Sequence, residues 1–163
     1  MEYLAHTDKN RTQTMKEHLY GTAELAGKFA GRFGKEEWGY CCGLLHDIGK
    51  YSEAFQDKIR NNSDRIVDHS TAGARVCEEK GGLYPFLEYC IAGHHAGLPD
   101  YGSSSDAGNA PTLSGRRKKK IEDYSAYKDE IQIPELKTVP FDPGKTSDPD
   151  YSLSVFIRML FSC

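Results

Sequence analysis

The chain has 163 residues, of which 38% are hydrophobic and 28% are charged, a balance that suits one domain with a hydrophobic core. Its formal net charge of -3 excludes a uniformly basic nucleic-acid coat protein, although not a local basic patch. No apolar run approaches the roughly 18 residues of a membrane span, and the N-terminus lacks the apolar core of a signal peptide, so we expect a soluble, cytoplasmic protein without membrane contacts.

The first third of the chain shows the periodicity of helices. In residues 14–33 the apolar residues recur at steps of three and four, which predicts an amphipathic helix. A second helix is expected over residues 35–46, and Gly49 is placed to end it. Ser52 can then cap a short third helix that ends near residue 59.

The middle of the chain predicts two more helices. Asp68 has the position of an N-cap for a helix over residues 69–80, which ends at a pair of glycines. Pro85 suits the first turn of the next helix, expected over residues 85–95. Both helices carry histidines at their ends.

The last third alternates between loops and helices. Residues 98–115 form a long Gly/Ser/Asn-rich loop, of a kind that is usually mobile or functional. The basic run RRKKK opens an expected helix over residues 116–131, and residues 134–151 read as an irregular connector. Residues 152–163 begin an apolar helix that stops without a cap, which is typical of a chain cut inside a helix. With no strand alternation in the sequence, we expect one all-α domain over residues 1–163 that is C-terminally truncated.

The histidines are the strongest functional signal. Five of the six fall at or near ends of the expected helices, in apolar surroundings: His18, His46, His69, His94 and His95. His6 lies in the polar N-terminal segment and is left out of this set. Asp47 and Lys50 lie next to His46 in an apolar segment, where unpaired charges are costly, so a partner such as a metal ion is expected.

The donor types limit the kind of metal. Imidazoles with one carboxylate suit Mn, Fe, Co, Ni or Zn, and they offer too few oxygens for calcium. The five cysteines contain no C-x-x-C pair, which indicates reduced thiols rather than a structural zinc site. A carboxylate beside a ligating histidine can bridge two ions, and such a pair can activate water against a phosphodiester.

The order of these motifs resembles a known superfamily. GLLHDIGKYSEAFQ, DHSTAGA and IAGHHAGLPD, preceded by His18, resemble the HD phosphohydrolases in their two-metal form, and more closely the HD nuclease domain of the CRISPR-associated nuclease-helicase of type I systems. The resemblance implies an all-helical domain that cuts single-stranded DNA with two divalent transition-metal ions in antiviral defence. It also implies recruitment by a CRISPR RNA-guided surveillance complex and a helicase that is either fused or separate.

The same resemblance implies roles for individual residues. Two ligand groups would share Asp47 as a bridge, with His18 and His46 on the first ion and His69, His94 and His95 on the second. Lys50 would act with Asp47 in catalysis by facing the scissile phosphate or leaving oxygen, but it also fits a solvated lysine at a helix C-terminus. The superfamily pattern closes with an aspartate that this chain does not reach, so we expect a weakened first site.

Several readings stay open. Ser70 either contacts substrate or caps its helix. Arg116, Arg117 and Lys118 either track a DNA backbone or form a solvated charge run. The function alternatives are an HD phosphodiesterase for small or cyclic nucleotides, a helical di-iron oxygenase and a non-catalytic module that binds a partner.

Overall fold

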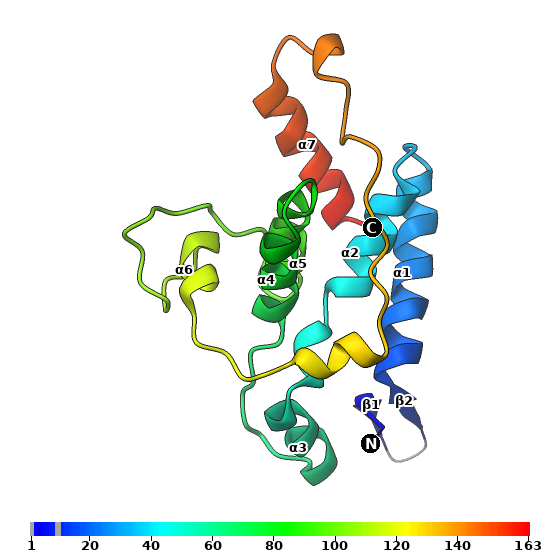
Figure 1. Ribbon diagram of the computed structural model, residues 1–163, viewed down its shortest axis with the longest axis vertical. Coiled ribbons are helices and arrows are strands. Elements are labelled where there is room, and N and C mark those ends of the chain that lie inside the picture. The colour runs from blue at the N-terminus through cyan, green and yellow to red at the C-terminus, as the bar shows by residue number, and fades with distance from the viewer. Residues whose placement is uncertain (1, 9–10) are drawn as a thin grey trace.

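In the computed structural model, which describes residues 2–8 and 11–163, the chain begins with a short hairpin and continues as helices (Figure 1). Strand β1 (Leu4–Thr7) pairs antiparallel with β2 (Thr12–Thr14). The sequence did not predict these strands, because three or four residues are too few to show a periodicity of two. Tertiary contacts hold the hairpin, since the Gln56 amide exchanges hydrogen bonds with the backbone of Leu4 as a neighbouring strand would.

Helices α1 (Met15–Gly31) and α2 (Glu36–Leu45) form an antiparallel pair. Thr14 and Glu17 cap the start of α1 in a capping box, with each side chain bonded to the other residue's backbone NH. The two helices approach closely where Gly43 of α2 faces the backbone of α1, because a Cβ at this position would lie 2.7 Å from the Thr22 carbonyl oxygen.

The rest of the chain packs around this pair. Its elements are η1 (Ile48–Tyr51), α3 (Glu53–Asn61), α4 (Ser70–Lys80), η2 (Tyr84–Leu87), α5 (Glu88–Gly93), α6 (Leu113–Lys118), η3 (Ser125–Asp129), η4 (Pro143–Lys145) and α7 (Pro149–Phe161). Figure 1 shows α5 between α2 and α6, and α7 above them. The predicted all-α fold is confirmed, apart from the small hairpin.

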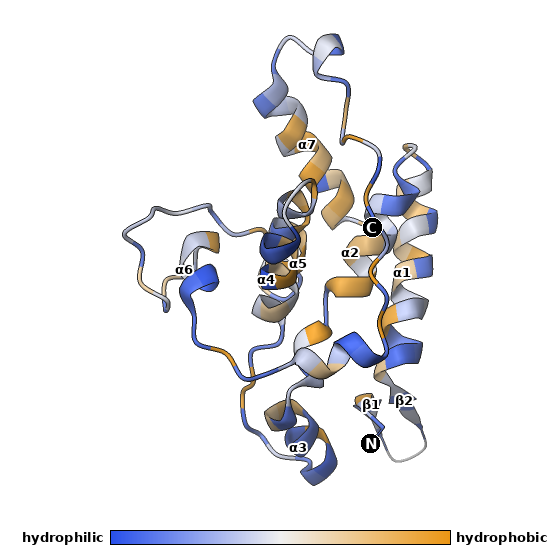
Figure 2. Cartoon of the chain, viewed as in Figure 1, coloured by the Kyte–Doolittle hydropathy of each residue, from blue (hydrophilic) through white to orange (hydrophobic). Residues whose placement is uncertain are grey.

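The hydrophobic core lies between α1, α2, α4 and α5. Figure 2 shows hydrophobic residues concentrated on α2 and α5 and along α7, whereas α3 is mainly hydrophilic. Fully buried side chains include Trp38, Leu44, Leu45, Leu87 and Ile91. The core therefore reaches the ends of α2 and α5, where the conspicuous histidines follow.

Two local predictions are wrong, and a third is confirmed only in part. The expected helix over residues 116–131 ends at Lys118 and is followed by extended chain and η3. The expected helix over residues 85–95 divides into η2 and α5. Ser52 occupies the N-cap position of α3 as predicted, but it makes no capping hydrogen bond, because its hydroxyl donates to the Gly49 carbonyl instead, at 2.9 Å.

The structure also bears on the expectations about membrane spans and cysteines. None of the helices in the described part of the chain is both long and apolar enough to span a bilayer. All five cysteines are free thiols, as expected from their spacing.

Candidate metal centre

The structure brings together the residues that the sequence singled out. Two groups of side chains have donor atoms within 4.8 Å of one another, His18 with His46 and Asp47, and Asp47 with His69, His94 and His95. Three of these positions follow from helix ends, since His46 and His94 directly follow α2 and α5 and His69 directly precedes α4, whereas His18 lies in the first turn of α1. The two groups are those expected for the two ions, and metal binding by them stays a prediction.

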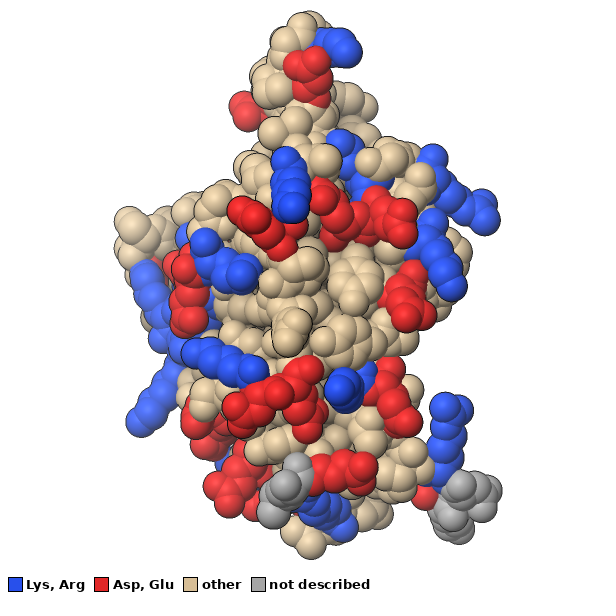
Figure 3. Space-filling model, turned by 45° about the vertical axis from the view of Figure 1, so that its right-hand side comes forward, with Lys and Arg blue, Asp and Glu red and all other residues tan. Residues whose placement is uncertain are grey.

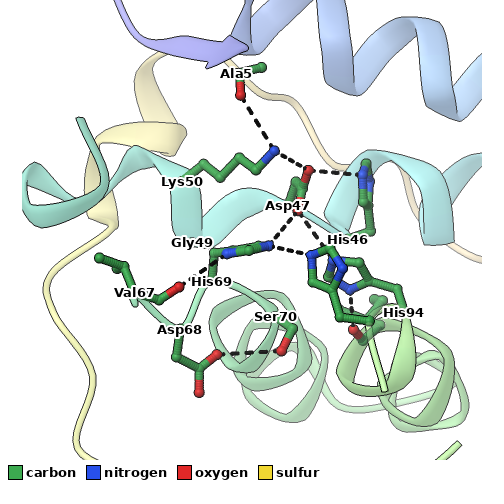
Figure 4. A network of polar contacts seen from close by, with 12 residues as sticks. Ala5, His46, Asp47, Gly49, Lys50, Val67, Asp68, His69, Ser70 and His94 are labelled. Carbon is green, nitrogen blue, oxygen red and sulfur yellow. Dashed lines mark hydrogen bonds and ion pairs between the residues drawn. The ribbon is translucent and has the colours of Figure 1, made fainter. Parts of the chain in front are cut away.

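Asp47 lies between the two groups with one carboxylate oxygen facing each (Figure 4). Oδ2 is 2.9 Å from His18 Nε2 and 3.2 Å from His46 Nε2. Oδ1 is 3.3 Å from both His69 Nε2 and His94 Nε2. The side chain is therefore placed as a bridge, and it is 4% exposed.

Backbone carbonyls orient three of the imidazoles. The contacts are His46 Nδ1 to the Gly43 oxygen at 2.7 Å, His69 Nδ1 to the Val67 oxygen at 3.2 Å and His94 Nδ1 to the Ile91 oxygen at 2.7 Å. A carbonyl oxygen can only accept, so each Nδ1 carries the proton and each Nε2 keeps its lone pair. Ligating histidines in metal sites have the same outer contacts.

Unpaired buried atoms show that the residues fit a metal ion. Asp47 Oδ1 and His94 Nε2 face each other across 3.3 Å, yet within the described residues neither has a hydrogen-bond partner. Both are acceptors, and a buried acceptor without a donor is costly. A divalent cation satisfies both, and nitrogen with carboxylate oxygen is a donor set that suits transition metals.

The protonation states also suit metal binding. Burial raises the pKa of the Asp47 carboxyl, but the neighbouring imidazoles outweigh burial and hold this pKa well below its ordinary value, and the largest lowering effect comes from His18, whose Nε2 lies 2.9 Å from Asp47 Oδ2. Burial lowers the pKa of His69 to about 4. At neutral pH the carboxylate is therefore ionised and His69 is neutral, which are the forms that bind metal.

Lys50 is part of the centre. Its Nζ lies 2.9 Å from Asp47 Oδ2 and 3.5 Å from the Ala5 carbonyl oxygen, so the ammonium sits between the hairpin and Asp47 (Figure 4). The alternative of a solvated lysine is wrong, because Lys50 is 5% exposed.

Ser70 and Arg116 contact each other beside the centre. Ser70 is buried, and its hydroxyl accepts a hydrogen bond from Arg116 Nη1 at 2.9 Å. The helix is capped by another residue, since Asp68 Oδ1 accepts from the Thr71 NH at 3.1 Å. Asp68 therefore bonds to the first turn of α4 as expected, although the N-cap position belongs to His69 and the helix begins one residue later than predicted. Substrate contacts by Ser70 and Arg116 stay a prediction.

Two further residues of the basic run, Arg117 and Lys118, have partners within the protein. Arg117 makes a two-pronged hydrogen bond to Glu88, at 2.9 and 3.0 Å, and Glu88 is completely buried. Lys118 donates to the carbonyl oxygens of Ser104 and Asp106. These contacts draw the chain away from a helical path after Lys118, and DNA contacts by Arg117 and Lys118 stay a prediction.

We predict that Arg117→Met lowers the free energy of unfolding by about 3–5 kcal/mol, because it leaves the buried Glu88 carboxylate without its guanidinium. Lys120→Met is the matched control, since Lys120 belongs to the same run but is exposed. Urea unfolding of both variants measures the difference. Equal stability of the two would show that the Arg117–Glu88 pair contributes nothing.

His6 is the residue that the sequence missed. Its ring centroid lies 4.9 Å from that of His18, with the rings edge to face. His6 thus adjoins the first ligand group, although it belongs to neither set of close donor atoms. No local signal could have found it, because only the hairpin brings this segment against α1.

Comparisons with known proteins agree with this geometry. The sequence model of the family described as HD domain matches residues 15–138. The match includes both ligand groups and the basic run, and it leaves out His6. Among curated proteins, none matches the chain significantly.

Proposed function

The chain belongs to the HD domain family, whose members are typically metal-dependent hydrolases, and we propose that it hydrolyses phosphodiester bonds of single-stranded DNA. One observation carries the proposal, the buried Asp47 carboxylate with one oxygen towards each group of imidazoles. A carboxylate placed in this way would be able to contact two cations, and two-metal sites are a common means of phosphodiester hydrolysis.

Each part of the centre has a task in this proposal. His18, His46 and Asp47 hold the first divalent ion, and Asp47, His69, His94 and His95 hold the second. When bound, the ions supply a water of lowered pKa and positive charge for the phosphate oxygens. The backbone carbonyls that accept from Nδ1 keep the Nε2 atoms aimed at the centre without rearrangement.

Lys50 adds a positive charge that the fold holds in place. Its ammonium is buried against Asp47 and the Ala5 carbonyl, so little conformational freedom is lost when substrate arrives. We assign it to the scissile phosphate or the leaving oxygen, where a fixed cation stabilises developing negative charge.

The proposal of DNA as substrate rests on access and on the resemblance of the motifs. The ligand side chains of His18, His46, His69 and His94 are 15–18% exposed, so the centre opens to the surface. On the face drawn in Figure 3, acidic and basic side chains intermingle among the described residues. A flexible single strand can reach such a centre through a few contacts, for which Ser70, Arg116, Arg117 and Lys118 are the proposed candidates.

The setting in the cell is proposed on the same resemblance. We assign the chain to CRISPR antiviral defence in the cytoplasm, with an RNA-guided surveillance complex that delivers the DNA and a helicase that feeds the single strand. Such a division of labour explains why the domain itself needs no sequence-reading element.

A cleavage assay tests the proposed function. Circular single-stranded DNA is incubated with the protein and, in turn, Mn, Fe, Co, Ni, Zn and Mg, with duplex DNA and cyclic nucleotides in parallel. We expect cleavage of the circle with transition metals, which requires an endonuclease, and slower cleavage of duplex. Hydrolysis of cyclic nucleotides alone would favour the small-nucleotide phosphodiesterase, and absence of bound metal would favour a non-catalytic module.

We predict that the second group fills before the first. The second has four donor residues, whereas the first has three, and its Asp47 Oδ2 is also in contact with Lys50. Calorimetric titration with Mn²⁺ should show one tight and one weaker binding step. His18→Ala should remove only the weaker step and His95→Ala should weaken the tight one, whereas two equally tight steps in the parent would contradict this order.

A further inference from the structure

The hairpin presents an additional imidazole to the first ligand group. The ring centroids of His6 and His18 are 4.9 Å apart. Within the ligand groups, the corresponding separations run from 4.1 Å for His94 and His95 to 5.6 Å for His69 and His94, with 5.1 Å for His18 and His46. The separation of His6 from His18 therefore lies within the range found among the ligand rings themselves.

The backbone that carries His6 is anchored on both sides. Leu4 exchanges two hydrogen bonds with the Gln56 amide, at 2.9 and 3.0 Å, and Gln56 is 1% exposed. Ala5 is buried, and its carbonyl faces Lys50. On the other strand, Gln13 pairs with His6 two residues before α1 begins. The location of His6 beside the centre is thus built into the fold.

The side chain of His6 is free to bind a ligand. It is exposed, unlike the neighbouring Ala5. Its ring nitrogens have no hydrogen-bond partner in residues 2–8 and 11–163, whereas the ligand rings of His46 and His94 are each held by a carbonyl. A histidine that supported only the core would be buried or bonded.

We propose that His6 is a further ligand of the first metal ion, an inference that rests on the proposed function. The first group has one donor residue fewer than the second. His6 lies outside the set of donors within 4.8 Å of one another, so binding requires rotation of its side chain. Exposed side chains rotate in picoseconds to nanoseconds, so this step does not limit binding.

Contact with His18 alone would give His6 a different role, that of holding the His18 ring in place. The two roles separate in His6→Phe, which keeps an aromatic ring against His18 but has no donor nitrogen. His6→Ala removes both the ring and the donor. Thr7→Ala is the matched control, because Thr7 is the next residue of β1 and is also exposed.

The test is calorimetric titration of the parent and these variants with Mn²⁺ alone, supported by the absorption spectrum of bound Co²⁺, whose intensity reports the coordination number. In both His6 variants, the affinity of the weaker step should fall at least about tenfold, which is the usual effect of removing a residue that supports a metal site. In both His6 variants, the tight step and the helical content should equal those of the parent. The Thr7→Ala variant should equal the parent in both binding steps. A changed Co²⁺ spectrum in His6→Phe would identify a lost ligand.

If His6→Phe binds Mn²⁺ in the weaker step as tightly as the parent does, His6 is not a ligand. If only His6→Ala loses affinity in this step, His6 merely holds the His18 ring in place. Asp47→Ala separates this failure from failure of the proposed function. If Asp47→Ala loses metal and His6→Phe does not, only the role of His6 is wrong. If Asp47→Ala still binds two ions, the two-metal centre itself is wrong.

Discussion

Replacing Asp47 by alanine is expected to remove both metal ions and to lower DNA cleavage by about a thousandfold or more, because the charges that stabilise the transition state are lost with the ions. Asp47 is the only donor residue shared by the two groups of described side chains. Its loss therefore affects both ions at once, whereas the loss of any one histidine affects one. Metal content by mass spectrometry and cleavage of circular single-stranded DNA measure the two effects.

Stability of the Asp47 variants needs a control. Alanine leaves the buried Lys50 ammonium without its carboxylate, and this costs stability. Asp47→Asn keeps an oxygen that accepts from Lys50, so it should fold with the helical content of the parent. The asparagine amide is neutral and has an NH2 group in place of the second oxygen, so this variant should lose at least one ion. An Asp47 variant that is folded and cuts DNA near the parent rate would refute the assignment.

Gly49→Ala should both destabilise the protein and impair the second ligand group. A Cβ at this position would lie 2.3 Å from the His69 carbonyl oxygen and 2.5 Å from its Cα. Because these are backbone atoms, the start of α4 must move, and we expect a loss of about 1–3 kcal/mol in the free energy of unfolding. His69 moves with it, so the tight Mn²⁺ step should weaken as well.

Gly21→Ala is the matched control for this substitution. A Cβ at Gly21 meets nothing within 4 Å, and the residue lies on the exposed side of α1. Alanine in a helix is favoured over glycine by about 0.5–1 kcal/mol, so this variant should be slightly more stable than the parent. Urea unfolding and Mn²⁺ titration compare the two. Parent-like stability and metal binding in Gly49→Ala would show that α4 is not held against Gly49.

Gly49 also illustrates how a sequence can indicate a residue but not its task. The pattern placed it as the end of the second helix, yet α2 ends at Leu45 and Gly49 lies within η1. Its lack of a side chain matters because the backbone of His69 packs directly against it. That contact joins segments 20 positions apart, and local propensity cannot reveal it.

The basic run makes the same point about charged residues. Sequence composition can identify RRKKK as a cluster but cannot choose its partners. Glu88 precedes Arg117 by 29 positions, and their pairing depends on how α5 and α6 pack. Lys119 likewise reaches Asp68, at 2.5 Å. These long-range pairs, rather than helix propensity, decide where α6 ends.

The sequence by itself determined the helical class, the approximate positions of the main helices and the six candidate ligands. It could do so because helix periodicity and capping are local, and because histidines at successive helix ends form a pattern along the chain. Only the tertiary structure decided which oxygen of Asp47 faces which group, where Lys50 is buried and that His6 adjoins the centre. Those features depend on burial and on contacts between distant segments, whose free energies arise only when the helices pack together.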